Sequence, residues 1–132
     1  MTRNTYILLC ALLFAGCAET SIQPLTQSTF KVATVSECGA KGTRDIAFRA
    51  AAIEVIKRGG DRFIVAGDGS SSAVTGGQYL GYGNFQTYGV NNQDMIVQLR
   101  PNTDSEALSA RNTLGTDWQR IVAEGIPEMC IT

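Results

Sequence analysis

A strand, an amphipathic helix and a second strand follow one another in the middle of the chain, and this block constrains the fold most. Residues 29–37, TFKVATVSE, alternate in character and are rich in β-branched side chains, as strands are. A helix is predicted to run from an N-cap at Thr43 to a left-handed stop at Gly59-Gly60. Residues 62–67, RFIVAG, then predict a short apolar strand. We expect a helix packed across a sheet, with parallel strands if the helix is a crossover.

The C-terminal half adds one more strand and two helix starts. Residues 93–100, QDMIVQLR, are typical of a strand, which Pro101 ends. Capping boxes begin at Thr103 and Thr116, with Gly115 as a break between the two helical segments. The fold class predicted is therefore α+β: a small sheet of about three to four strands with helices packed on one face, in the order β-α-β-loop-β-α.

Residues 67–92 differ from the rest of the chain in composition. They hold seven glycines and one charge. One interpretation is an aromatic binding surface for a glycan or another envelope protein, formed by Tyr79, Tyr82, Phe85 and Tyr88. The other, which we favour, is a flexible or weakly paired excursion, part of which is a hairpin turning near Gly81 or Gly83-Asn84.

The N-terminus has the organisation of an export signal. Arg3 precedes a short apolar run from Tyr6 to Phe14, which is too short to span a bilayer. The next residues, Ala15-Gly16-Cys17, resemble the bacterial lipobox, with Phe14 where leucine is usual. This resemblance implies cleavage after residue 16 and acyl chains on Cys17 that anchor the chain in a membrane. Ordinary signal cleavage, with Cys17 incidental, is the alternative.

Three segments follow from this interpretation. Residues 1–16 are a lipoprotein signal peptide, residues 17–28 are the lipidated cysteine with a polar tether, and residues 29–132 are a single periplasmic α+β domain. Ala18 stands where enterobacterial lipoproteins retained in the inner membrane usually have aspartate, which implies an outer-membrane protein facing the periplasm.

Two cysteines, Cys38 and Cys130, remain in the exported chain once Cys10 has left with the signal and Cys17 is acylated. The periplasm is oxidising, so we predict a structural disulfide that holds the C-terminal segment against the strand at residues 29–37. A redox-active pair usually has closer spacing, and a metal site lacks ligands because the chain has no histidine.

Composition argues against several classes of function. Without the signal, ten basic and twelve acidic residues remain, which gives no basis for nucleic-acid binding. The absence of histidine removes the commonest general base, and no serine or paired carboxylates stand in a catalytic pattern. We expect no enzymatic activity, no cofactor and no metal site.

The pattern as a whole resembles the small RcsF/YbjQ-type envelope lipoproteins. The features shared are the lipobox, a strand, an alanine-rich helix, GGDRFIV, a Ser/Gly-rich crossover and a closing strand. The RcsF-type protein is an outer-membrane stress sensor with two disulfides, whereas one cysteine pair is available here. We therefore expect a lipid-anchored envelope protein with a structural or partner-binding role. The alternative is a sensor or ligand-binding module that uses residues 67–92.

Overall fold

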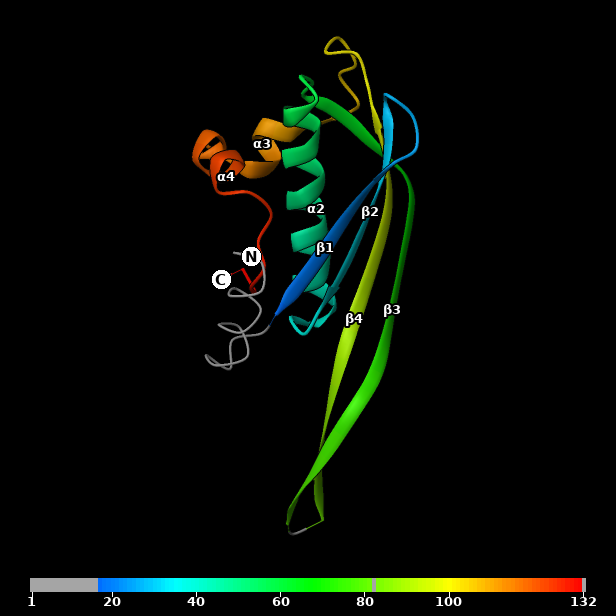
Figure 1. Ribbon diagram of the computed structural model, residues 1–132, viewed down its shortest axis with the longest axis vertical. Helices are drawn as coiled ribbons and strands as arrows, with labels where there is room; N and C mark the ends of the chain where they lie inside the picture. Colours follow the sequence, from blue (N-terminus) through cyan, green and yellow to red (C-terminus); the bar gives the residue numbers. More distant parts are fainter. Residues whose placement is uncertain (1–16, 82, 132) are drawn as a thin grey trace, which may run out of the picture.

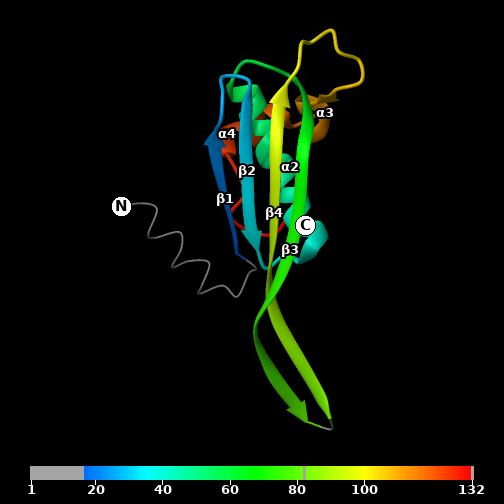
Figure 2. The same ribbon diagram turned by 90° about the vertical axis from the view of Figure 1, so that its right-hand side faces the viewer.

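The computed structural model describes residues 17–81 and 83–131. Within this part, one antiparallel sheet of five strands is covered on one face by three helices (Figures 1 and 2). The order of the strands across the sheet is β1-β2-β4-β3-β5. The α+β class is confirmed, and the sheet is larger than the three to four strands predicted.

The bounds of the elements are as follows. The strands are β1 (Ala18–Pro24), β2 (Thr29–Ser36), β3 (Arg62–Gly81), β4 (Asn84–Leu99) and β5 (Leu108–Ser109), and the helices are α2 (Gly39–Lys57), α3 (Ala110–Leu114) and α4 (Trp118–Glu124).

Residues 18–24 are a strand, so the prediction of a tether over residues 17–28 is wrong for this part. β1 pairs with β2 from Ala18 to Pro24. Ile22 packs against the core, and the hydroxyl groups of Thr20 and Thr34 are 2.9 Å apart. Most side chains of β1 are small or polar, and a segment of this composition resembles a linker in sequence. Pairing with β2 along its whole length therefore decides that this segment is a strand.

Residues 67–92 are paired throughout most of their length, so they form a much longer hairpin than the weakly paired excursion expected from the sequence, and the predicted turn near Gly81 or Gly83-Asn84 is confirmed. β3 and β4 form one long hairpin in which Phe63 lies opposite Leu99 and Gly81 lies opposite Asn84. The expected strands at 62–67 and 93–100 are the two ends of this hairpin. Glycine lowers strand propensity, but pairing with a neighbouring strand compensates for it here.

α2 is the crossover between β2 and β3. Both strands are antiparallel to β4, so they run in the same direction with β4 between them. The helix begins at Gly39, one turn before the predicted cap. Thr43 is buried inside the helix, and its hydroxyl donates to the carbonyl of Gly39 at 2.7 Å. The predicted stop is confirmed, since Gly59 has φ +84°.

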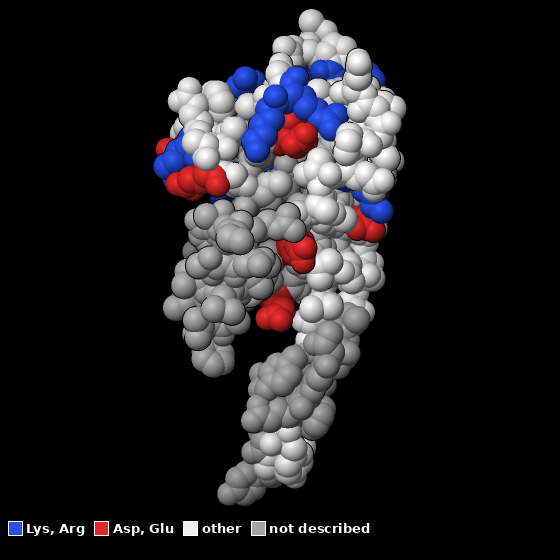
Figure 3. Space-filling model, viewed as in Figure 1, with Lys and Arg blue, Asp and Glu red and all other residues white. Residues whose placement is uncertain are grey.

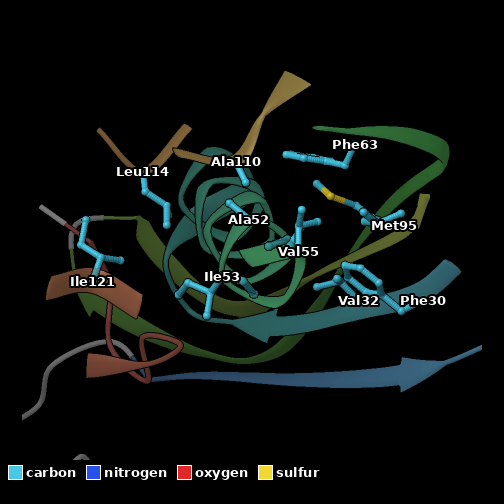
Figure 4. Close-up of a cluster of buried hydrophobic side chains, with 14 residues drawn as sticks. Phe30, Val32, Ala52, Ile53, Val55, Phe63, Met95, Ala110, Leu114 and Ile121 are labelled. Atoms are coloured by element: carbon cyan, nitrogen blue, oxygen red, sulfur yellow. The ribbon is translucent and has the colours of Figure 1, made fainter. Parts of the chain in front are cut away.

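The core lies between α2 and the sheet (Figure 4). Alanines form much of the buried face of α2, and their small side chains let the helix approach the strands closely. Phe30, Val32, Phe63, Met95 and Val97 fill the space from the sheet side, and all are fully buried. Trp118 packs against the edge of this core.

Asp61 attaches the start of α3 to the sheet. Its carboxylate accepts hydrogen bonds from the hydroxyl of Ser109 at 2.9 Å and from the backbone N–H of Arg111 at 3.0 Å. The guanidinium of Arg111 lies 3.2 Å away. Partial burial by itself would raise the pKa of Asp61, but these donors outweigh it and hold the pKa below its usual value.

Replacing Asp61 with asparagine should therefore change the acid sensitivity of the protein. A lowered folded-state pKa means that the contribution of Asp61 is complete above about pH 4 and is lost as the pH falls further. The free energy of unfolding of the parent should drop more steeply between about pH 4 and pH 2 than that of Asp61→Asn. Urea unfolding at a series of pH values measures this, with Glu19→Gln as the control. Parallel curves for the parent and Asp61→Asn would contradict the assignment.

Candidate functional site

The β3–β4 hairpin extends beyond the rest of the sheet. β2 pairs with β4 only as far as Ser36, opposite Asn91. From Ala73 and Val90 to the tip, β3 and β4 pair with each other alone, and the hairpin projects from the end of the body where β1 begins (Figures 1 and 2). Seven to nine residues per strand at about 3.3 Å each correspond to a projection of about 23 to 30 Å. The described hydrophobic core packs without residues from this projection, so the projection is not needed to form the core.

The projecting part carries no formal charge. Residues 69–93 contain no Asp, Glu, Lys or Arg, and the described atoms of the hairpin show none in Figure 3. The charged side chains visible in the same view lie on the body.

The pairing register separates the projecting residues into two faces. β4 is continuous, whereas β3 has irregularities between Val74 and Gly76 and between Tyr79 and Gly81. The helix-side face, which continues the side covered by α2, holds the positions Val74, Gly77, Tyr79, Phe85, Thr87 and Gly89. The open face holds the positions Ala73, Gly76, Gln78, Gly81, Asn84, Gln86, Tyr88 and Val90. All three amide residues therefore belong to the open face.

Of the four aromatic residues predicted to form one binding surface, Tyr79 and Tyr88 occupy positions on opposite faces of the hairpin. Tyr79 is 65% exposed, and its phenol oxygen accepts a hydrogen bond from the backbone N–H of Gly83 at 3.1 Å. Phe85 lies opposite Tyr79 in the register, but Tyr88 lies opposite Gly76 on the other face. For Phe85 and Tyr88 the structure describes the backbone, and Tyr82 lies outside the described residues. Backbone pairing brings together two of the predicted residues, Tyr79 and Phe85.

A polar cluster at the base of the hairpin was missed in the sequence. The carboxylate of Asp68 accepts hydrogen bonds from the side-chain amide of Gln93 and, at 2.5 Å, from the guanidinium of Arg44 on α2. Gln93 is 2% exposed, and its amide also donates to the carbonyl of Gly69 at 3.1 Å. The cluster connects the helix to both strands of the hairpin. The one available signal was that Asp68 is the single charge between Arg62 and Asp94.

Replacing Asp68 with alanine should loosen the base of the hairpin. The buried amide of Gln93 loses an acceptor, which costs about 1 to 3 kcal/mol. Chemical unfolding should show this loss, and hydrogen exchange should be faster at residues 68–72 and 91–95. Asp94→Ala is the matched control, because Asp94 is 56% exposed and its partner Lys31 is 3.9 Å away. Its effect should stay within about 0.5 kcal/mol. Equal effects of the two changes would contradict a special role for Asp68.

The predicted disulfide is present between Cys38 and Cys130, whose Cα atoms are 5.5 Å apart. Cys38 is the N-cap of α2, so the bond joins the start of this helix to the C-terminal tail. The tail lies against the first residues of the domain rather than against β2. Met129 forms a bridge with Cys17, and the N–H of Ala18 donates to the carbonyl of Glu128 at 2.9 Å. The half-buried Cys17, the disulfide and the base of the hairpin thus lie at the same end of the body.

A groove of about 860 Å³ runs between α4, the C-terminal tail and α2. Basic side chains (Arg49 and Arg120) and acidic ones (Glu124 and Glu128) line it together, so its charge selects no ligand class. In the part of the chain that the structure describes, no three metal-ligating side chains come together. No helix in residues 17–81 and 83–131 combines the length and apolar character needed to cross a membrane.

The chain matches no protein-family model, no curated protein and no solved structure. The projecting hairpin, with its polar base and its neighbour Cys17, is the candidate functional site on the strength of its own geometry.

Proposed function

We propose that this protein is a lipid-anchored component of the bacterial cell envelope, in the outer membrane facing the periplasm, that binds a partner through the β3–β4 hairpin. The observation that carries the proposal is the uncharged hairpin projecting from the end of the body that holds Cys17. The role is non-catalytic, in keeping with a chain that has no histidine.

The proposed anchor rests on the lipobox-like residues Ala15-Gly16-Cys17. In the fold, β1 begins at Ala18, directly after this cysteine. The carbonyl of Cys17 also accepts a hydrogen bond from the N–H of Glu37 at 3.2 Å. Acyl chains on Cys17 would therefore attach the chain to the membrane next to the base of the hairpin.

The proposed binding element has the properties of an exposed strand pair. Unpaired N–H and C=O groups along a strand edge can pair with another chain, and this is a common mode of recognition. The division of Tyr79 and Tyr88 between opposite faces is a poor arrangement for stacking one glycan, so a protein partner is favoured. The core as described contains no residue from 69–92, which leaves the hairpin available for binding.

A photo-reactive amino acid tests the proposal in intact cells. Placed at Tyr79, which is 65% exposed, it should form protein adducts. The matched control is Val35, which is 43% exposed on the uncovered face of the sheet, and it should form few.

A shortened hairpin tests the same proposal from the opposite direction. Ser72 lies directly opposite Asn91, so residues 73–90 can be replaced by Asn-Gly, a favoured two-residue turn. The shortened protein should keep its disulfide and its membrane fraction and lose the partner captured by the full chain. Equal capture by the full and shortened proteins would overturn the proposal.

A further inference from the structure

The two edges of the sheet differ in how far they are protected from pairing with other chains. β1, at one edge, has seven residues, includes Glu19 and ends at Pro24. The C-terminal tail, attached by the disulfide, also covers its first residues. Short length, charge, proline and a covering segment are the usual protections of an edge strand.

β3, at the other edge, lacks these protections. Among the described strands, only β5 pairs with its outer side, at Arg62 and Phe63. Beyond Phe63, no described strand pairs with this outer edge up to Gly81. Asp68 is the single charge along this length, and its carboxylate is already engaged by Arg44 and Gln93.

The hairpin has a second open edge on β4. β2 pairs with β4 as far as Asn91, so no described strand pairs with the outer side of residues 84–90, which lie opposite residues 73–81 of β3 in the hairpin. All three prolines of the chain lie outside both segments, and so do all the charged residues. One hairpin therefore presents two unprotected edges, of similar length, on its opposite sides.

We propose that copies of this chain assemble through their hairpins, with residues 73–81 of one copy pairing antiparallel with residues 84–90 of the next. The inference rests on the proposed lipid anchor for its geometry. An antiparallel two-fold contact between two β3 edges would point the hairpins in opposite directions and carry the two Cys17 anchors to opposite ends, and a parallel one would turn the helix-covered faces of the two copies to opposite sides. A contact between β3 and the β4 of the next copy keeps every hairpin and every anchor pointing the same way.

The residues of the hairpin suit this arrangement. Neighbouring copies would continue both faces, so that positions 78, 84 and 86 would recur on the same face across the assembly. The body is five strands wide and the hairpin is two, so neighbouring bodies must diverge from the contact. The register irregularity between Val74 and Gly76 lies at this junction, where a bulge bends a strand. Because this contact joins two different edges, each copy still has an edge for a further copy, and the assembly can grow beyond two copies.

Cysteine pairs placed on separate copies test the contact. One tagged full-length chain carries Gln78→Cys and a second, differently tagged chain carries Gln86→Cys, so a short bis-maleimide can link these positions only between copies. We expect crosslinks between position 78 of one copy and position 86 of another in the membrane fraction. Because neighbouring copies can be displaced along the strand direction, the second cysteine is also placed at position 84 or 88 in place of 86. The matched control is Gln23→Cys on β1, which is exposed and should give none.

The size of the detergent-solubilised protein provides the second readout. The full chain should have a mass of at least three copies, and the protein with residues 73–90 replaced by Asn-Gly should be a monomer. A monomeric full chain, an absence of 78–86 adducts, or 78–78 adducts in their place would overturn the assembly.

Palmitate labelling separates this inference from the proposed function. Label on Cys17 without adducts would leave the anchor standing and overturn the assembly. Adducts at 78–86 without label would support the assembly and overturn the anchor. Adducts of position 79 with a different protein, and none with a second copy, would keep the partner-binding role and overturn self-assembly.

Discussion

Replacing Cys38 and Cys130 together with alanine should lower the free energy of unfolding by about 2 to 5 kcal/mol. The bond joins positions 92 residues apart, so its loss releases a long loop in the unfolded chain. It also frees the tail that pairs with Cys17 and Ala18 at the start of β1. The midpoint of thermal unfolding should fall by about 10 to 20 °C, which is a large share of the stability of a domain of this size.

Reduction of the parent protein is the natural control for this change. The reduced parent and the double variant should unfold together, and both should unfold well before the oxidised parent. Hydrogen exchange should increase first in the tail and in the first turn of α2, which the bond joins. Unchanged unfolding of the double variant would contradict a stabilising role for the disulfide.

Replacing Cys17 with alanine should move the protein from the membrane fraction to the soluble fraction or leave it as an unprocessed precursor. Each buried methylene of an acyl chain contributes about 0.8 kcal/mol, so losing several chains removes stable anchoring. The backbone contacts of residue 17 with Glu37 and Met129 are available to alanine as well, so the fold should persist. Palmitate labelling and the intact mass of the mature chain measure the change directly.

Cys10→Ala is the matched control for the anchor, because Cys10 lies within the apolar run of the signal. It should label and fractionate like the parent. A mature parent chain that is unmodified at Cys17, or that starts at another residue, would refute the anchor.

Much of the body follows from local patterns in the sequence. β2 is predicted by its alternation, and the end of α2 by Gly59, because strand periodicity and helix termination depend on neighbouring residues. The Cys38–Cys130 bond is predicted by counting the thiols that would remain if the chain is exported to an oxidising compartment, and the structure shows this bond. The class and the covered face of the sheet follow from the order of these elements.

The sequence alone misplaced the features that depend on distant residues. β1 and the hairpin consist of small, polar or glycine-rich segments whose local propensity is weak, so pairing with β2 and with each other decides their structure. The cluster of Arg44, Asp68 and Gln93 joins residues 24 to 25 positions apart. The direction of the hairpin relative to Cys17 is set by the register of four strands. Such contacts arise from tertiary pairing, which leaves no periodic pattern of residues in the sequence. Only the folded structure therefore shows them.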